Sequence, residues 1–290
     1  MHLLSTRAPA KINLSLAVTG RRADGLHNLS SLVAFARFGD QLTLQPGPNL
    51  CLTVNGPYAG LAGPPGDNLV LVAARQFASR LPGARLGAFH LVKRIPVAAG
   101  LGGGSADAAA ALRLLAQANH LAPGDERVIA AAAATGADVP VCLAARPRFM
   151  SGTGAELGPA LPLPPLFAVL VNPRLAVETR AVFAAMALSP GQPALASRTP
   201  VIPGNYTAAS LIAALKRAGN DMEDAACVLA PVIVPVLAVL AAARGARLSR
   251  MSGSGATCFA LFDDCRAASR AARSIALGYP GWWVKASVVG

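Results

Sequence analysis

Residues 96–109 form a glycine-rich loop with the sequence Pro96-Val97-Ala98-Ala99-Gly100-Leu101-Gly102-Gly103-Gly104-Ser105-Ala106-Asp107-Ala108-Ala109. An apolar strand is predicted before it, over residues 88–95, and an Ala/Leu-rich helix after it, over about 107–121. This order suits phosphate binding, because glycines let successive backbone N–H groups converge and the helix start adds partial positive charge. Ser105 is the predicted helix cap. A tight turn without a ligand is the alternative, but it does not require so many glycines.

Three familiar phosphate loops do not match this stretch. A Walker A loop needs a lysine after the glycines, and none is present. The Rossmann fingerprint fails because its third glycine would fall at Ser105 and no suitably placed acidic residue follows. The further signature sequences of protein kinases are also absent. The remaining class is a kinase with another kind of glycine loop.

The composition favours a globular protein with anionic small-molecule ligands. Hydrophobic residues make up 53% and charged residues 14%, and the net charge is +12. The cations are dispersed and aromatic residues are only 5%, so nucleic-acid binding is not expected. Five scattered cysteines without a C-x-x-C pair indicate reduced, buried thiols in a cytoplasmic protein, rather than a disulfide frame or a zinc site. The N-terminus lacks the apolar core of a signal peptide.

The uncharged stretch over residues 225–243 is long enough to raise the question of a membrane span. It contains Pro231 and Pro235, is rich in alanine, and has neither a partner segment nor an aromatic belt. We therefore predict a buried helix in the core of a soluble domain, and no membrane association.

Irregularly ordered strands and helices predict an α+β fold. Strands are predicted over residues 8–20, 32–38, 41–54, 88–95, 166–172 and 257–262, and helices over residues 68–81, 107–121, 128–135, 177–186, 210–218 and 221–243. A low-complexity loop is predicted over residues 187–205. The Pro-rich passage 158–165 is the predicted boundary between domains 1–157 and 158–290, and the last strand is a candidate to return to the first domain.

Residues 96–109 resemble the ATP motif of the GHMP small-molecule kinases. The resemblance implies a two-domain fold in which each domain is a mixed or antiparallel sheet with helices. It also implies ATP as the phosphoryl donor, bound mainly by the N-terminal domain, together with Mg²⁺ whose ligands are not assigned. The ATP-binding residues that it implies are Asn68, Pro96, Val97, Ala98, Ala99, Gly100, Leu101, Gly102, Gly103, Gly104, Ser105 and Ala106. Ala106 departs from the family, which usually has a second serine there, and a capping role explains Asn68 equally well.

Further segments are similar to one branch of that family, which acts on a cytidine-diphosphate derivative of methylerythritol. They are Ala8-Pro9-Ala10-Lys11-Ile12-Asn13-Leu14, Arg22-Ala23-Asp24-Gly25-Leu26-His27, Gly136-Ala137-Asp138-Val139-Pro140, Asn220-Asp221-Met222-Glu223 and Met251-Ser252-Gly253-Ser254-Gly255-Ala256. The resemblance implies phosphorylation of the substrate's 2-hydroxyl in the non-mevalonate route to isoprenoid precursors. A monomer or weak homodimer is expected.

Lys11 and Asp138 are the catalytic pair that the resemblance implies. By pattern alone, Lys11 would be a solvated lysine on the polar face of a half-buried strand, and Asp138 a turn residue. In the implied role, Asp138 orients the attacking hydroxyl and accepts its proton, while Lys11 keeps Asp138 ionised and offsets charge on the transferring group.

The substrate-binding residues that the resemblance implies are Asn13, Leu26, His27, Thr179 and Phe183. His27 would read the cytosine edge, although it could equally be a turn histidine beside Asp24. Phe183 would stack on the base, with plain helix core as its alternative. The family usually has tyrosine at the position of Leu26, so one aromatic face is missing and weaker cytidine binding is expected. Residues 252–255 would lie beside the sugar or phosphates, or form only a turn.

Two other functions stay open on the sequence. One is a kinase of the same family for another alcohol, such as homoserine or mevalonate, which residues 24–27 argue against. The other is a non-catalytic nucleotide-binding regulator, which would be favoured if Lys11 and Asp138 lay far apart in the fold.

Overall fold

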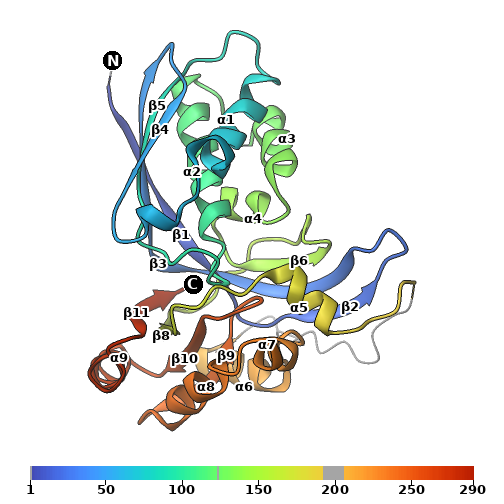
Figure 1. The fold of residues 1–290 in the computed structure, drawn as a ribbon, viewed down its shortest axis with the longest axis vertical. Coiled ribbons are helices and arrows are strands. Elements are labelled where there is room, and N and C mark those ends of the chain that lie inside the picture. Colours follow the sequence, from blue (N-terminus) through green and yellow to red (C-terminus); the bar gives the residue numbers. More distant parts are fainter. Residues whose placement is uncertain (1, 123, 192–205) are drawn as a thin grey trace. The chain divides into compact units, whose positions relative to one another are not determined.

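The computed structural model describes residues 2–122, 124–191 and 206–290. The chain forms two compact units whose segments interleave along the sequence. The first unit comprises residues 1–11, 38–97 and 102–145, and the second comprises residues 12–37, 98–101 and 146–290. Each unit carries strands with helices packed against them (Figure 1), which confirms the predicted α+β class. The domain boundary at residues 157 and 158 stays a prediction.

The first unit holds strands β4 (Cys51–Asn55) and β5 (Leu86–Val92) beside parts of β1 (Leu4–Asn13) and β3 (His27–Gly47). The strand order is β4–β5–β3, and β1 also pairs with β3. β5 is antiparallel to β3 and parallel to β4, so this sheet is mixed. Four helices accompany it (Figure 1): α1 (Leu69–Ala78), α2 (Gly103–Ala118), α3 (Glu126–Thr135) and α4 (Val139–Ala144). The alanines of α2 are almost all buried, which lets α1 and α4 approach it closely.

The second unit holds β2 (Ala17–Arg21), β6 (Arg148–Gly152), β7 (Glu156–Leu157), β8 (Leu166–Asn172), β9 (Ala246–Met251), β10 (Cys258–Phe262) and β11 (Trp283–Val289). These strands form an antiparallel sheet in the order β3–β11–β8–β10–β9, which the first part of β3 begins. β2 and β6 also pair with β3, and β7 pairs with β6. Its helices are α5 (Thr179–Ala185), α6 (Ala208–Arg217), α7 (Glu223–Leu229), α8 (Ile233–Ala242) and α9 (Cys265–Gly278). The apolar faces of α8 and α9 pack on this sheet.

The predicted break between strands 32–38 and 41–54 is wrong, because β3 runs unbroken from His27 to Gly47. Gly39, which falls between the two predicted strands, lies inside β3. A Cβ at this position would come within 2.2 Å of the carbonyl oxygen of Ala8. Gly39 is therefore required for the close approach of β1 rather than for a turn.

The single buried helix predicted over residues 221–243 is also wrong. The chain forms α7 and α8, separated around Ala230 and Pro231, because a proline inside a helix removes a hydrogen bond and clashes with the preceding turn. Their outer faces expose large apolar side chains, with Val228 78% and Val234 53% accessible. None of the helices in the described residues has the length and apolarity that crossing a bilayer requires.

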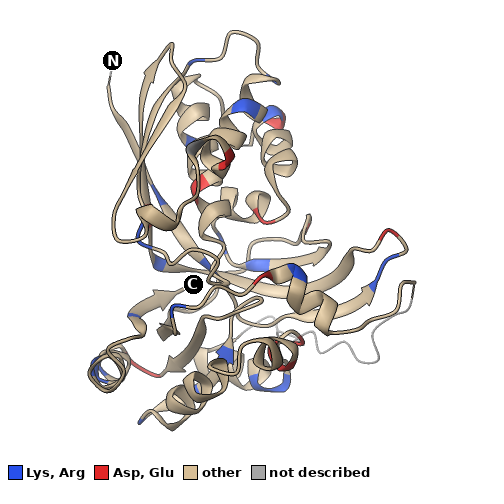
Figure 2. Ribbon diagram, in the orientation of Figure 1, with Lys and Arg blue, Asp and Glu red and all other residues tan. Residues whose placement is uncertain are grey.

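Lysine and arginine residues are spread over many elements rather than gathered on one (Figure 2). All five cysteines carry free thiols, as predicted. The predicted burial holds for Cys142 and Cys258 but is wrong for Cys51 and Cys265, which are exposed. Of the loop predicted over residues 187–205, the part from 192 onward lies outside the described residues.

Candidate active site

Lys11 lies near the end of β1 and forms an ion pair with Asp138. Lys11 Nζ is 3.0 Å from Asp138 Oδ2, and the two side chains are 5% and 36% exposed. The prediction that Lys11 would lie on a solvated polar face is therefore wrong. Asn13 and Ser15, on the same side of the expected strand, are buried as well. Alternation along the strand does not reveal this, because here both of its faces are covered.

Asp138 stands at the N-cap position of α4, but its carboxylate makes no capping bond to that helix. Aspartate at an N-cap ordinarily accepts a backbone N–H of the first turn. Here the carboxylate is paired with Lys11 and remains partly open to solvent. Its position at the end of a rigid helix leaves it available to a substrate hydroxyl.

The glycine loop meets this ion pair at Gly102. The residue has a φ of 59°, in the left-handed region that glycine adopts without strain. A Cβ at Gly102 would lie 3.2 Å from both Cβ and Cε of Lys11, so the lysine stem packs directly against the loop. The absence of a side chain thus brings the N-terminus of α2 next to the Lys11–Asp138 pair.

Ser105 is not the cap of α2, contrary to the prediction. The helix begins at Gly103, with Gly102 as its N-cap and no side-chain capping bond, so Ser105 lies within the first turn. The glycines themselves can adopt helical geometry, which moves the start of the helix into the loop. Unlike Ser105, Ala106 is buried, and at 1% exposure it has no room for a hydroxyl that would reach solvent.

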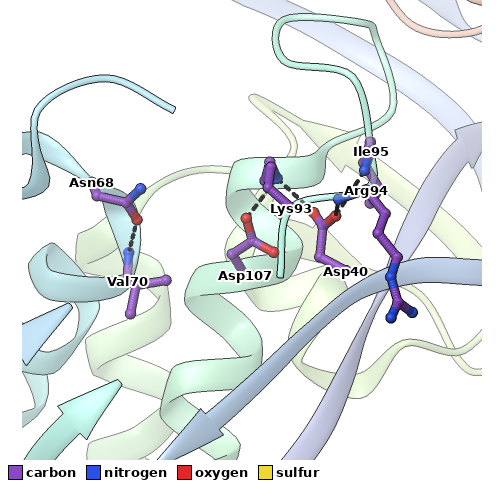
Figure 3. A network of polar contacts seen from close by, with 7 residues as sticks. All are labelled: Asp40, Asn68, Val70, Lys93, Arg94, Ile95 and Asp107. Atoms are coloured by element: carbon purple, nitrogen blue, oxygen red, sulfur yellow. Dashed lines mark hydrogen bonds and ion pairs between the residues drawn. The ribbon is translucent and has the colours of Figure 1, made fainter. Parts of the chain in front are cut away.

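Asn68 caps α1 beside the start of α2. Its side-chain oxygen accepts the Val70 N–H at 3.0 Å (Figure 3). A Cβ at Gly104 would lie 3.3 Å from Leu69 Cδ1, which places the beginning of α1 against the exposed glycine face of α2. Asn68 therefore has a structural role in the cap of α1.

A buried charge network beneath the loop was not found from the sequence. Lys93 Nζ lies 2.6 Å from Asp40 Oδ2 and 2.6 Å from Asp107 Oδ2 (Figure 3). The other oxygen of Asp40 accepts the backbone N–H groups of Arg94 and Ile95. A Cβ at Gly103 would lie 3.1 Å from Lys93 Nζ, so the ammonium group is directly under the first residue of α2.

The Asp40–Lys93–Asp107 network places two carboxylates around one ammonium group in the protein interior. Burial raises the pKa of Asp107 well above its ordinary value, although the charge of Lys93 acts to lower it. Burial alone would lower the pKa of Lys93, but the charges of Asp107 and Asp40 outweigh it and raise that pKa. Lys93 is thus held as a cation that joins β3, β5 and α2.

The raised pKa of Asp107 predicts a pH-dependent effect of Asp107→Asn. A carboxyl whose folded pKa exceeds its unfolded one contributes stability that is present below the unfolded pKa and is lost as pH rises through the folded pKa. Asparagine carries no such proton, yet its oxygen can still accept from Lys93. Between the unfolded and folded pKa of Asp107, the parent therefore loses stability as the pH rises and the Asn variant does not. The free energy of unfolding of the variant should rise relative to that of the parent by at most about 1.4 kcal/mol per pH unit.

Urea unfolding of parent and Asp107→Asn proteins at several pH values from about 5 to about 8 measures this difference. Glu126→Gln, at an exposed position on α3, is the matched control and should show a difference that is flat with pH. A flat difference for Asp107→Asn would contradict the prediction.

In the second unit, the first part of the glycine loop packs on residues 252–255. A Cβ at Gly100 would lie 2.4 Å from the carbonyl oxygen of Ser252 and 2.7 Å from that of Gly255. Ser252 Oγ donates to the Gly100 carbonyl at 3.0 Å and accepts the Asn13 N–H at 3.1 Å. Residues 252–255 thus do more than form a turn, because they fix Gly100 and Asn13 together.

The motif Asn220-Asp221-Met222-Glu223 supports this turn from behind. The Asn220 side chain donates to the carbonyls of Met251 and Gly253, and Glu223 Oε2 accepts the Met251 N–H. Asp221 Oδ2 accepts the Val18 N–H on β2. No role was predicted for this motif, and its hydrogen bonds show that it supports residues 252–255.

The predicted substrate residues on α5 and β3 meet in the same unit. The rings of His27 and Phe183 stack with centroids 4.3 Å apart and an angle of 12° between their planes. One turn earlier on α5, Thr179 Oγ1 lies 2.8 Å from Ser254 Oγ. Phe183 also packs partly buried against the core of this unit, and α5 connects the aromatic pair to residues 252–255.

His27 has an unusual environment for a turn histidine. Its Nε2 is buried and has no hydrogen-bond partner among the described residues. Burial lowers the pKa of His27, and the positive charge of Arg21 lowers it further, so the ring is neutral at neutral pH. Leu26, in contrast, is 55% exposed. A buried polar atom without a partner is unfavourable, so the Nε2 of His27 calls for an explanation.

Two models of the GHMP kinase family match the chain, the N-terminal domain over residues 68–146 and the C-terminal domain over residues 207–281. A 4-diphosphocytidyl-2-C-methyl-D-erythritol kinase from Methylobacterium radiotolerans is 59% identical over 285 residues, which cover 98% of this chain and 98% of that protein. The chain belongs to the 4-diphosphocytidyl-2-C-methyl-D-erythritol kinase family. The family resemblance found from the motifs is therefore confirmed, and with it the membership of a family of small-molecule kinases that use ATP.

Solved structures agree with this assignment. The crystal structure of a 4-(cytidine 5'-diphospho)-2C-methyl-D-erythritol kinase is 33% identical, covers 99% of each chain and has a TM-score of 0.75. A homoserine kinase from Cytophaga hutchinsonii has a TM-score of 0.67, covering 99% of this chain and 95% of its own, at 20% identity. That second likeness shows a shared fold alone. The 4-diphosphocytidyl-2-C-methyl-D-erythritol kinase family thus has the predicted two-domain GHMP fold.

Proposed function

We propose that this chain transfers the γ-phosphoryl group of ATP to the 2-hydroxyl of 4-diphosphocytidyl-2-C-methyl-D-erythritol, a step in non-mevalonate isoprenoid precursor synthesis. The observation that carries the proposal is the Lys11–Asp138 ion pair packed against Gly102. It places a carboxylate and an ammonium group at the start of the glycine helix, in a member of this kinase family. The same proximity argues against a non-catalytic nucleotide-binding regulator.

In the proposed reaction, Asp138 Oδ1 or Oδ2 accepts the proton of the attacking hydroxyl and orients that hydroxyl toward the γ-phosphorus. Lys11 pairs with the carboxylate and offsets negative charge on the transferring group. The N–H groups at the start of α2 are oriented toward the phosphates by the Gly102 turn. Because phosphoryl transfer has a loose transition state, the positions of these groups matter more than their basicity.

We assign Mg²⁺ to the phosphates of ATP rather than to a protein cage. No group of three histidine, cysteine or acidic side chains suited to hold a metal ion occurs among the described residues. Mg²⁺ usually keeps several waters and binds through substrate phosphates and one or two carboxylates, so such a cage is not needed. When bound, the ion neutralises charge on the phosphates.

The His27–Phe183 pair is the proposed recognition site for the cytosine. The unpartnered, neutral His27 ring can hydrogen-bond the edge of the base, and Phe183 offers an aromatic face for stacking. Thr179 and Asn13, which contact residues 252–255, are proposed to lie beside the sugar and phosphates. Leu26 supplies apolar contact only, so we expect weaker cytidine binding than in relatives with tyrosine there.

Phe183→Ala should raise the KM for the cytidine substrate by about 10-fold or more, because stacking on one base contributes about 1–3 kcal/mol. The KM for ATP should stay unchanged. Met186→Ala is the matched control, since Met186 follows the same helix and packs partly buried on the same core. Steady-state kinetics with each substrate varied in turn make the comparison, and an unchanged cytidine KM in a folded variant counts against the assignment.

We propose that the protein is a monomer or weak homodimer. We also propose a cytoplasmic location, because five free thiols, two of them exposed, suit a reducing compartment. A coupled ATPase assay tests the function with the cytidine-diphosphate substrate, homoserine and mevalonate. Turnover with the cytidine substrate supports the proposal, turnover with another alcohol alone replaces it, and ATP binding without any turnover favours a regulator.

A further inference from the structure

Arg113, in the middle of α2, is largely buried and makes an unusual set of contacts. One terminal nitrogen, NH1, donates to the carbonyls of Cys142 and Leu143 at 3.0 Å and 3.3 Å. The other, NH2, donates to the carbonyl of Arg7 at 2.7 Å. In the part of the chain that the structure describes, Arg113 has no carboxylate partner. Burial accordingly lowers the pKa of its guanidinium group.

These three carbonyls belong to the two elements that carry the Lys11–Asp138 pair. Arg7 lies on β1, the strand that continues to Lys11. Cys142 and Leu143 form the end of α4, the short helix whose N-cap is Asp138. Cys142 is in turn hydrogen-bonded to Asp138, because its N–H donates to the Asp138 carbonyl at 3.3 Å. The guanidinium group is therefore a bridge between the backbones of both site residues.

Burying an arginine without a counter-ion is costly, so its retention needs a reason beyond packing. The last carbonyls of a helix lack intrahelical partners and carry partial negative charge, which a cation can satisfy. The planar, forked guanidinium group can donate to carbonyls on two elements in fixed directions, whereas the lysine ammonium is a compact charge on a flexible stem. These hydrogen bonds thus allow Arg113 to hold α4 against β1.

We propose that Arg113 is a positioning residue, which holds β1 and α4 at the separation that keeps Lys11 and Asp138 in productive geometry. The inference rests on the catalytic role proposed above for that pair. A displacement of about 1 Å in a positioned group can reduce turnover by about 10²-fold, so a loosened α4 is enough to affect the reaction. Arg113 touches neither nucleotide nor hydroxyl and acts through the other two residues.

A double-mutant cycle tests this coupling. Arg113→Met keeps the length and much of the apolar volume of the side chain but removes all donors. It should lower kcat by about 10-fold or more while the KM for ATP changes by less than about 2-fold. In an Asp138→Asn background the same change should lower kcat by less than about 2-fold, because the geometry that Arg113 maintains no longer matters.

Arg127→Met, an exposed arginine on α3, is the control and should leave kcat unchanged. Thermal unfolding of each protein distinguishes a loss of folding from a displacement of Lys11 and Asp138 in a folded protein. Arg113→Lys replaces Arg113→Met if the latter does not fold. Equal losses of kcat in both backgrounds, or a lowered Tm with normal kcat, overturn the inference. If Asp138→Asn alone leaves kcat intact, the proposed role of the pair fails instead.

Discussion

Replacing Asp138 with asparagine should lower turnover at least ~10²-fold, and Lys11→Ala should have an effect of similar size. Asparagine preserves the shape of the side chain but cannot accept the hydroxyl proton. Lys11→Ala removes the ammonium group 3.0 Å from that carboxylate and leaves the transferring group without its charge. The two losses should not add, because the residues act as a unit on one proton and one phosphoryl group.

Single-turnover and steady-state measurements with saturating ATP separate this loss from a change in binding. The KM for ATP should be nearly unaffected in Asp138→Asn, since the glycine helix is intact. Glu178→Gln, at an exposed acidic position before α5, provides a control for the loss of one carboxylate. Near-normal turnover of the Asp138→Asn protein would remove Asp138 from the role of base.

Lys93→Ala should destabilise the protein by about 3–5 kcal/mol, which is the usual cost of removing one partner from a buried ion pair. The substitution leaves the carboxylates of Asp40 and Asp107 facing one another, with 0% and 2% exposure and no cation between them. It also removes the group beneath Gly103. We therefore expect ATP affinity to fall together with stability.

Denaturant unfolding monitored by circular dichroism measures the free energy of unfolding in this case. Lys216→Ala, an exposed lysine in the last turn of α6, is the control and should change it by less than about 0.5 kcal/mol. Adding Asp107→Asn to Lys93→Ala should recover part of the loss, because one of the two unpaired carboxylates is then neutral. A double variant no more stable than Lys93→Ala would show that charge is not the cause.

The local parts of the fold could be predicted from the sequence. The strand at Leu166–Asn172 and the helix ending at Thr135 follow from apolar runs and a terminating glycine. The glycine loop and its neighbouring helix were found for the same reason, since turn residues and periodicity are local signals. The cap of α2 was misplaced because glycines can occupy either a loop or a first helical turn, and only packing against Lys11 and Lys93 decides between them.

The charge network could not be predicted in this way. Lys93 is separated by 53 residues from Asp40 and by 14 from Asp107, and no spacing rule joins them. Arg113 gave no signal either, because its partners are backbone carbonyls, which every residue has. The Lys11–Asp138 pairing was expected only through family resemblance, and by pattern alone Lys11 would have been assigned to solvent. Contacts between distant segments depend on tertiary packing, which local patterns do not encode.

The interleaving of the two units limits how the chain can be dissected. A fragment starting at residue 146 would lack residues 12–37 and 98–101, which belong to the second unit. It would lose the part of β3 that pairs with β6 and with the end of β11, and so expose unpaired strand edges. Such edges promote association with other chains. Neither limited proteolysis nor recombinant expression of the C-terminal half alone should therefore yield a well-behaved folded domain.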